Sequence, residues 1–136
     1  MLIITIGYFG CKAQEKLENK FQSCVPCDMI NALDLKDTVI NINQVEDFLC
    51  SVQSKCQNNV EFTEYSNSVI FNLLEKKTVL FLKAFSESNR IDKEYILRQI
   101  SDPLKDYDIN EITLKVEKIK CNKQTKESII KALRGL

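Results

Sequence analysis

The residues with the greatest chemical potential in this 136-residue sequence are its six cysteines. They are Cys11, Cys24, Cys27, Cys50, Cys56 and Cys121. The middle four form two close pairs, which suits three kinds of chemistry. In an oxidising compartment they would form two structural disulfides, each contributing about 3 kcal/mol. Alternatively, the Cys24-Val-Pro-Cys27 motif is a redox-active pair, or all four thiolates hold a structural zinc ion.

Local context favours the disulfide interpretation. A redox-active CxxC pair starts a helix that follows a strand, whereas the preceding segment, EKLENKFQS (15–23), is typical of a helical or disordered segment. The cysteine spacing is close to the usual zinc-site spacing but differs from it. We therefore predict structural disulfides among Cys24, Cys27, Cys50 and Cys56, with their connectivity open. A thiol–disulfide or structural-zinc protein that uses Cys24 and Cys27 is the alternative, and Cys121 is expected to be a buried or partly buried free thiol.

The composition argues against most enzymatic chemistry. The sequence has no histidine, which removes Ser-His and Cys-His catalysis and every His-ligated metal site. Nineteen basic residues balance nineteen acidic ones, so the net charge does not favour nucleic acid. No Gly-rich phosphate loop is present. We predict that the protein is not an enzyme, uses no cofactor or metal and binds no nucleic acid.

One stretch matches part of a calcium-binding loop. Asp106, Asp108, Asn110 and Glu117 occupy the first, third, fifth and twelfth positions of that template. The sixth position, which requires glycine for a sharp turn, is Glu111. The same residues make a good helix start, so we predict that Asp108 caps a helix and that no calcium binds.

Other charged groups are expected to lie on solvated helix faces. Glu46–Asp47 and Glu61–Glu64 are candidate pairs of carboxylates, but nothing near them indicates catalysis. The C-terminal lysines alternate with acidic residues and have no aromatic residues among them, which disfavours a nucleic-acid site. They are Lys115, Lys118, Lys120, Lys123, Lys126 and Lys131.

The first ten residues, MLIITIGYFG, carry no charge and precede Cys11 and a polar run. Ten residues are too few to span a bilayer and match the apolar core of a signal peptide. With Gly10 before Cys11, the GCKAQ stretch resembles the processing site of bacterial envelope lipoproteins. The resemblance implies a signal-peptide remnant at 1–10, a lipid anchor at Cys11, a tether at 11–23 and a location in the cell envelope. The competing interpretation is a buried strand at 2–9, LIITIGYF.

The remaining sequence has the periodicity of short amphipathic helices. The segment 59–85 predicts two consecutive helices, with apolar residues at helical spacing followed by an almost entirely apolar run. We expect Asn43 to cap the preceding helix, with Glu46 completing a capping box, and Asp92 to cap the following one. A last helix is expected to begin at Thr125. Only three glycines and two prolines favour an all-α fold, with residues 24–136 as a single helical domain.

The segments YSNSVIFNLLEKKTVLFLKAF (65–85), IDKEYILRQISDPLKDYDINEI (91–112) and IIKALRGL (129–136) resemble small HEAT-like helical domains of bacterial envelope lipoproteins. The resemblance implies an irregular array of short antiparallel helices, a HEAT-like α-solenoid fragment, without known catalytic residues. Helical arrays commonly bind other proteins. We therefore predict a lipid-anchored protein-interaction module whose partner is another protein, for example an inhibitor or immunity-type protein. It would face the periplasm or lie on the cell surface.

Overall fold

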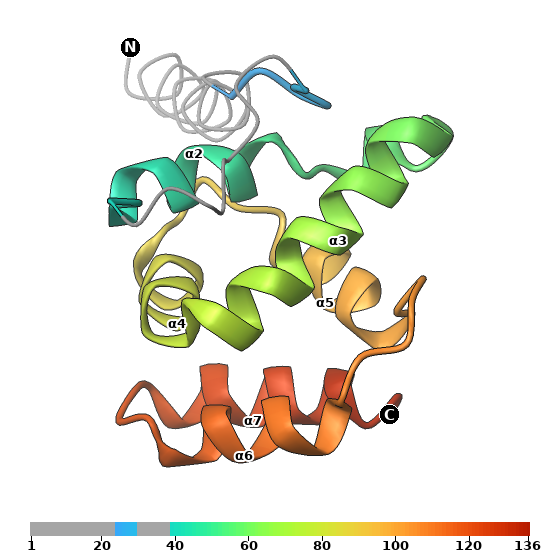
Figure 1. The fold of residues 1–136 in the computed structure, drawn as a ribbon. Helices are drawn as coiled ribbons and strands as arrows, with labels where there is room; N and C mark the ends of the chain where they lie inside the picture. The colour runs from blue at the N-terminus through green and yellow to red at the C-terminus, as the bar shows by residue number, and fades with distance from the viewer. Residues whose placement is uncertain (1–23, 30–38) are drawn as a thin grey trace, which may run out of the picture.

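A computed structural model describes residues 24–29 and 39–136 (Figure 1). In chain order its helices are α2 (Ile42–Ser51), the short 3₁₀ helix η1 (Ser54–Cys56), α3 (Val60–Lys76), α4 (Thr78–Glu87), α5 (Lys93–Ser101), α6 (Ile109–Lys118) and α7 (Lys123–Leu133). The described part of the chain has no strand, which confirms the all-α prediction. None of these helices is both long enough and apolar enough to cross a bilayer.

The helices are arranged in layers around α3 and α4 (Figure 1). On one side, α2 packs against α4. On the other, α6 and α7 run antiparallel and contact α3, α4 and α5. The described segment 24–29 lies beyond α2, at the opposite end of the molecule from the α6–α7 pair.

The predicted helix pair at 59–85 is confirmed as α3 and α4, which meet at Lys77. Phe62 and Phe71 of α3 and Phe81 of α4 are fully buried and supply the largest side chains of the core. The backbone at Lys77 has φ −131° and ψ 46°, so the helical path breaks there and α4 takes a new direction. This break lets both helices bury apolar faces in one core.

Several helix caps follow the predictions. The side chain of Asp92 accepts a hydrogen bond from the Tyr95 N–H at 3.2 Å, and Asp108 accepts one from the Glu111 N–H at 3.0 Å. Gly135 follows α7 with φ +72°, a left-handed conformation that glycine adopts without steric cost. The predicted caps of α5 and α6 are therefore confirmed.

Two predicted helix starts are wrong. The cap of α2 is Asn41 and not Asn43: Asn41 accepts from the Gln44 N–H at 3.0 Å, and Gln44 Oε1 accepts from the Asn41 N–H at 2.8 Å. This reciprocal pair satisfies two amides that would otherwise lack acceptors. Similarly, α7 begins before Thr125, because Asn122 accepts from the N–H groups of residues 124 and 125.

Candidate functional site: a groove positioned by two disulfides

The structure joins the four predicted cysteines in two disulfides, Cys24–Cys50 and Cys27–Cys56. The Cα atoms are 5.5 Å and 5.7 Å apart, the usual separation for disulfides. Each bond links the segment 24–29 to a helix, α2 in one case and η1 in the other. A redox-active CxxC motif forms a disulfide between its own two cysteines. Cys24 and Cys27 are instead each bonded to a cysteine elsewhere in the chain.

The turn at Cys27 explains how one short segment reaches both helices. Cys27 has φ +56°, a left-handed conformation that costs a residue with a Cβ atom about 1–2 kcal/mol. Its N–H donates to the Ser51 carbonyl at 3.0 Å, at the end of α2. This hydrogen bond and the Cys27–Cys56 disulfide hold the turn in place. The segment therefore has a fixed position against the end of α2.

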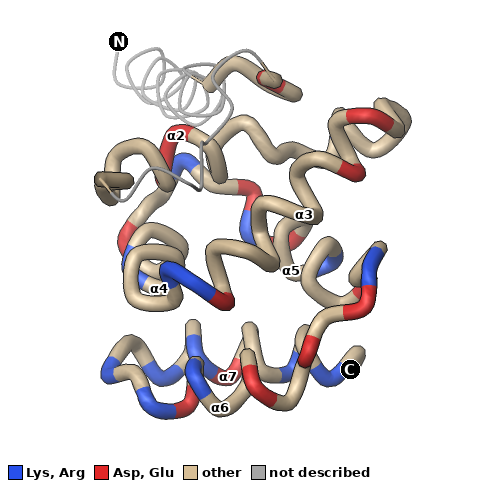
Figure 2. The backbone as a smooth tube through the Cα atoms, viewed as in Figure 1, with Lys and Arg blue, Asp and Glu red and all other residues tan. Residues whose placement is uncertain are grey.

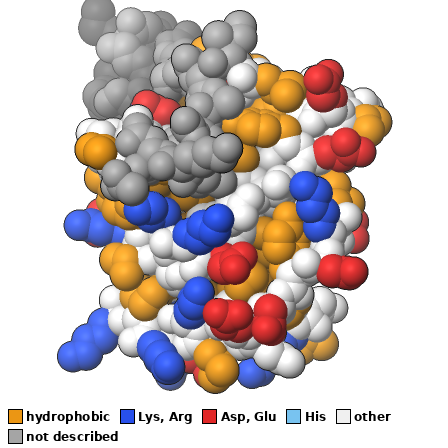
Figure 3. All heavy atoms as spheres, viewed as in Figure 1, with side chains coloured by type: hydrophobic (Ala, Val, Ile, Leu, Met, Phe, Trp, Pro, Cys, Tyr) orange, Lys and Arg blue, Asp and Glu red, His pale blue; other side chains and the backbone are white. Residues whose placement is uncertain are grey.

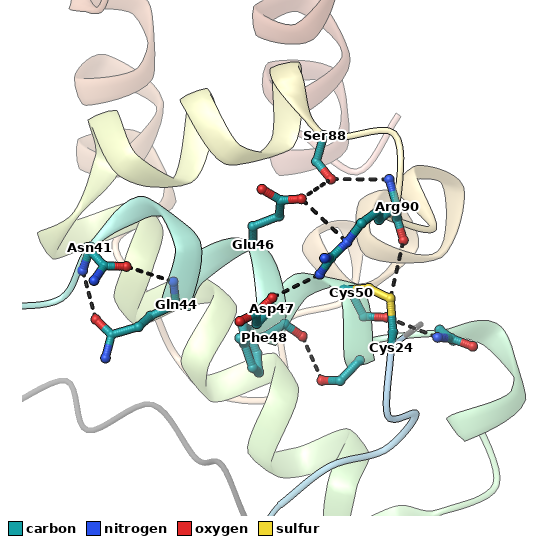
Figure 4. A network of polar contacts seen from close by, with 11 residues as sticks. Cys24, Asn41, Gln44, Glu46, Asp47, Phe48, Cys50, Ser88 and Arg90 are labelled. Atoms are coloured by element: carbon teal, nitrogen blue, oxygen red, sulfur yellow. Dashed lines mark hydrogen bonds and ion pairs between the residues drawn. A yellow bond between two sulfur atoms is a disulfide. The ribbon is translucent and has the colours of Figure 1, made fainter. Parts of the chain in front are cut away.

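The predicted carboxylate pair Glu46–Asp47 does not form a freely solvated face (Figure 4). Arg90, from the loop between α4 and α5, lies 3.5 Å from Glu46 Oε1 and 2.9 Å from Asp47 Oδ1. The Ser88 hydroxyl donates to Glu46 at 3.1 Å and accepts from the Arg90 N–H at 3.2 Å. The expectation of a solvated face holds for Asp47, whose side chain is 73% exposed, whereas Glu46, at 30%, is partly covered because Arg90 approaches from a different element. The two carboxylates attach α2 to the α4–α5 loop.

Asn67 plays a comparable role on α3. Although asparagine is usually exposed, only 1% of Asn67 is exposed. Its amide nitrogen donates to the Gln99 carbonyl and Gln99 Oε1, both at 3.0 Å, and to the Asp102 carbonyl at 3.3 Å. Its side-chain oxygen accepts from the Leu104 N–H at 3.0 Å. Asn67 thus fixes the loop between α5 and α6 onto α3. Its place in the sequence, among apolar residues of α3, gives no sign of this role.

These anchors create a groove of about 650 Å³ between the segment 24–29, α3 and the α5–α6 loop. We call it the Tyr107 groove. Its lining residues are Met29, Glu61, Glu64, Tyr65, Asn67, Ser68, Leu104, Lys105 and Tyr107. Met29 is 38% exposed and Leu104 49% exposed. The groove therefore presents apolar side chains to solvent from two segments that are held by disulfides and by Asn67.

Aromatic packing stiffens the walls of the Tyr107 groove. The Tyr107 ring stacks on Phe71 with centroids 4.5 Å apart and an interplanar angle of 7°. Tyr65 meets Phe48 edge to face at 6.1 Å. Such pairs contribute about 0.5–1.5 kcal/mol beyond the burial of their surface. The tyrosines therefore form part of the folded core while also lining the groove.

The charged residues of the groove are Glu61, Glu64 and Lys105, all exposed. Within residues 24–29 and 39–136, no group of three or more histidine, cysteine, aspartate or glutamate residues could hold a metal ion.

The residues that match the calcium-loop template do not act together in the structure. Asp108 caps α6, and Glu117 pairs with Arg134 of the C-terminal region at 3.6 Å. Asp106 and Asn110 are exposed. The predicted use of this stretch as a helix start is confirmed.

Other predicted residues have simpler outcomes. Cys11, the signal-peptide remnant 1–10, the tether 11–23 and the alternative strand 2–9 lie outside the described residues. Cys121 is a half-buried free thiol, as predicted. Among the C-terminal lysines, Lys123 pairs with Glu127 at 3.9 Å, and Lys126 donates to the Glu117 carbonyl at 3.0 Å.

Comparison with protein-family models, with curated proteins and with solved structures gave no match for this chain.

Removing the Cys27–Cys56 bond with the double substitution Cys27→Ser/Cys56→Ser is expected to lower the free energy of unfolding by about 2–3 kcal/mol. With Cys24–Cys50 intact, this bond closes a further loop made of the segments 24–27 and 50–56, and so restricts the unfolded chain. Guanidinium unfolding under non-reducing conditions measures the change. Cys121→Ser is the control and should change stability by less than about 0.5 kcal/mol. Equal stability of the double variant and the parent would contradict a structural role for this disulfide.

The substitution Asn67→Ala is expected to destabilise the fold by about 1–3 kcal/mol. It removes the side-chain hydrogen bonds by which Asn67 joins α3 to the α5–α6 loop. Urea unfolding gives the overall loss, and amide hydrogen exchange at Leu104 reports release of the loop. The neighbouring Ser68→Ala is the matched control, with little change in either measurement. A Leu104 amide that stays equally protected in Asn67→Ala would show that other contacts hold the loop.

Proposed function

We propose that this chain is an exported protein-interaction module that binds a partner protein at the Tyr107 groove. The observation that supports this proposal is the exposure of apolar groove residues on elements that are fixed before binding. Tyrosine and apolar anchors at the centre of an interface commonly provide most of the binding energy. Fixed walls reduce the conformational entropy that association would otherwise cost.

The charged residues of the Tyr107 groove indicate which kind of partner surface would fit it. Glu61 and Glu64 stand on the α3 side of the groove, against the single cation Lys105. On the face seen in Figure 3, acidic side chains gather mainly on the right and basic ones mainly on the left. A partner that presents an apolar side chain flanked by lysine or arginine would complement this groove, with charge complementarity contributing to orientation and association rate.

The proposed location is the bacterial cell envelope. Two disulfides are typical of proteins in oxidising compartments. The lipoprotein-like stretch around Cys11 supports attachment to a membrane through an acyl chain. The HEAT-like solenoid arrangement and an inhibitor or immunity-type role are finer versions of the same proposal. They rest on the resemblance and on the small helical domain.

The alternative function, a thiol–disulfide or structural-zinc protein centred on Cys24 and Cys27, has less support. Each of these sulfurs is bonded to a cysteine of another element, and Cys24 is only 6% exposed. A buried disulfide is a poor substrate for attack by an external thiolate, because the reaction requires access to the sulfur. Sulfurs that are bonded to each other also cannot ligate zinc as thiolates.

Binding at the Tyr107 groove can be tested by affinity capture from envelope extracts of the native host. The variant Leu104→Glu places a charge at an exposed apolar position of the groove and is expected to weaken capture of the partner by at least about tenfold, since truncating or charging a central anchor costs about 2 kcal/mol or more. Leu114→Glu is the matched control, because Leu114 is 56% exposed on α6 and lies outside the groove. A partner retained equally by both variants would exclude this groove as the binding site.

Export and lipidation can be tested by intact mass measurement of the protein purified from its native host. We expect loss of residues 1–10, a mass increase from acyl chains on Cys11, and a mass lower by two hydrogens for each of two disulfides. Treatment with a reductant should restore those hydrogens and leave the acyl mass unchanged. A mass equal to that of the unprocessed chain with reduced cysteines would refute the envelope location.

A further inference from the structure

A second groove lies at the junction of α3 and α4, facing the end of α6. It has a volume of about 510 Å³, and we call it the lysine groove. The lining residues are Glu75, Lys76, Lys77, Thr78, Val79, Leu80, Lys115, Lys118 and Ile119. Figure 2 shows the basic stretch at this junction above the α6–α7 layer. The lysine groove shares no residue with the Tyr107 groove.

The lysine groove has an apolar surface that is accessible to a partner. Val79, on the first turn of α4, is 60% exposed although valine is among the residues most often buried. Leu80 and Ile119 beside it are half-buried. These three side chains come from two separate helical regions and offer an apolar strip across the groove.

The charges around this strip are mainly positive. Four lysines and one glutamate line the groove. Lys115 is engaged by the protein itself, because its Nζ donates to the Glu75 carbonyl at 2.9 Å and lies 3.5 Å from Glu111. Lys76, Lys77 and Lys118 form no ion pair with any residue in the described part of the chain. Three cations are therefore available to an external anion.

The start of α4 also borders the lysine groove. No side chain caps α4, and its first turn contains no acidic residue. The carbonyl end of α3 and the side chain of Glu75 lie next to this turn and offset part of its positive charge. The three lysines therefore supply the positive potential of the groove.

We propose that the lysine groove binds an acidic amphipathic segment of a partner protein. Apolar side chains of that segment lie over Val79, Leu80 and Ile119, and its carboxylates pair with Lys76, Lys77 and Lys118. An open groove with an apolar strip fits a segment of chain better than an enclosed small molecule. A segment of chain can reach the half-buried Leu80 and Ile119 as well as the exposed Val79, whereas a flat membrane surface contacts mainly protruding groups. This second site is independent of the function proposed for the Tyr107 groove, because no residue is common to both.

The probe for this proposal is a short fluorescent peptide with leucines at helical spacing and glutamates between them. A matched peptide carries lysines in place of the glutamates. Fluorescence anisotropy with the full-length protein measures the dissociation constants, and amide chemical shifts locate the site. We expect the acidic peptide to bind at least about tenfold more tightly than the basic peptide, to shift the amides of Val79, Leu80 and Ile119, and to weaken with added salt.

Substitutions separate a specific site from a general charge effect. The triple variant Lys76→Glu/Lys77→Glu/Lys118→Glu is expected to weaken the acidic peptide by at least about tenfold, as is Val79→Asp. The matched control reverses three exposed lysines outside the groove, Lys55→Glu/Lys83→Glu/Lys131→Glu, with the same change in net charge. It should retain most of the affinity. Circular dichroism checks that every variant remains helical.

Several outcomes would overturn the proposal. Equal loss of affinity in the two triple variants would show a non-specific charge effect. Equal binding of the acidic and basic peptides would remove the role of the lysines. Binding to phosphatidylglycerol vesicles but not to the acidic peptide would assign the surface to lipid. Self-association that requires Lys76, Lys77 and Lys118, without peptide binding, would assign it to a second copy of the chain.

Discussion

Burial around most of the circumference of α3 is the constraint on which the other helices depend. Val69, Ile70 and Phe71 are consecutive residues and all three are buried, as are Leu73 and Leu74. Consecutive residues of an α-helix point about 100° apart, so no single neighbouring helix can cover this run. The chain therefore places α4, α5 and α6 around α3, and adds α2 and α7 to cover the outer surfaces of those helices. The helices around α3 have 9 to 11 residues, and each depends on tertiary packing for most of its stability.

Polar and covalent anchors then determine where the connecting segments lie. Asn67 fixes the α5–α6 loop, Arg90 fixes the α4–α5 loop to α2, and the disulfides fix the segment 24–29. A surface loop without such contacts would have to become ordered when a partner binds. The conformational entropy lost in this step would weaken the binding. The same interactions that stabilise the fold therefore give the Tyr107 groove its shape in the unbound protein.

Sequence periodicity was sufficient to predict helices because each apolar face is encoded locally, as in the segment 59–85. Asp92 and Asp108 were predictable caps for the same reason, since a cap and its amide partner are three residues apart. The roles of Asn67 and Arg90 were not predictable in this way. Asn67 contacts residues 32 to 37 positions away, and Arg90 contacts Asp47 across 43 positions. Such contacts depend on how the helices pack.

The disulfide connectivity could not be predicted from the sequence, because the separations between the cysteines do not identify the correct pairing. Cys24–Cys50 and Cys27–Cys56 have sequence separations of 26 and 29 residues. Loop-closure entropy varies only with the logarithm of loop length, so it does not separate the observed pairing from Cys24–Cys56 with Cys27–Cys50. Entropy alone would favour the third pairing, Cys24–Cys27 with Cys50–Cys56, because its loops are much shorter. The choice is made by geometry instead: the left-handed turn at Cys27 and its hydrogen bond to Ser51 direct the two sulfurs toward different helices.

The net charge of zero does not reveal that acidic and basic side chains gather at different grooves of the surface. Glu61 and Glu64 lie at the Tyr107 groove, while Lys76, Lys77 and Lys118 lie at the lysine groove. Since exposed charges interact strongly only within about 8–10 Å at physiological ionic strength, a partner responds to the local groups and not to the total. The two grooves also depend on different constraints. The disulfides position Met29 in the first groove, whereas the second is built entirely from α3, α4 and the end of α6. Oxidation of the cysteines therefore affects the shape of the Tyr107 groove directly, whereas the walls of the lysine groove depend on helix packing.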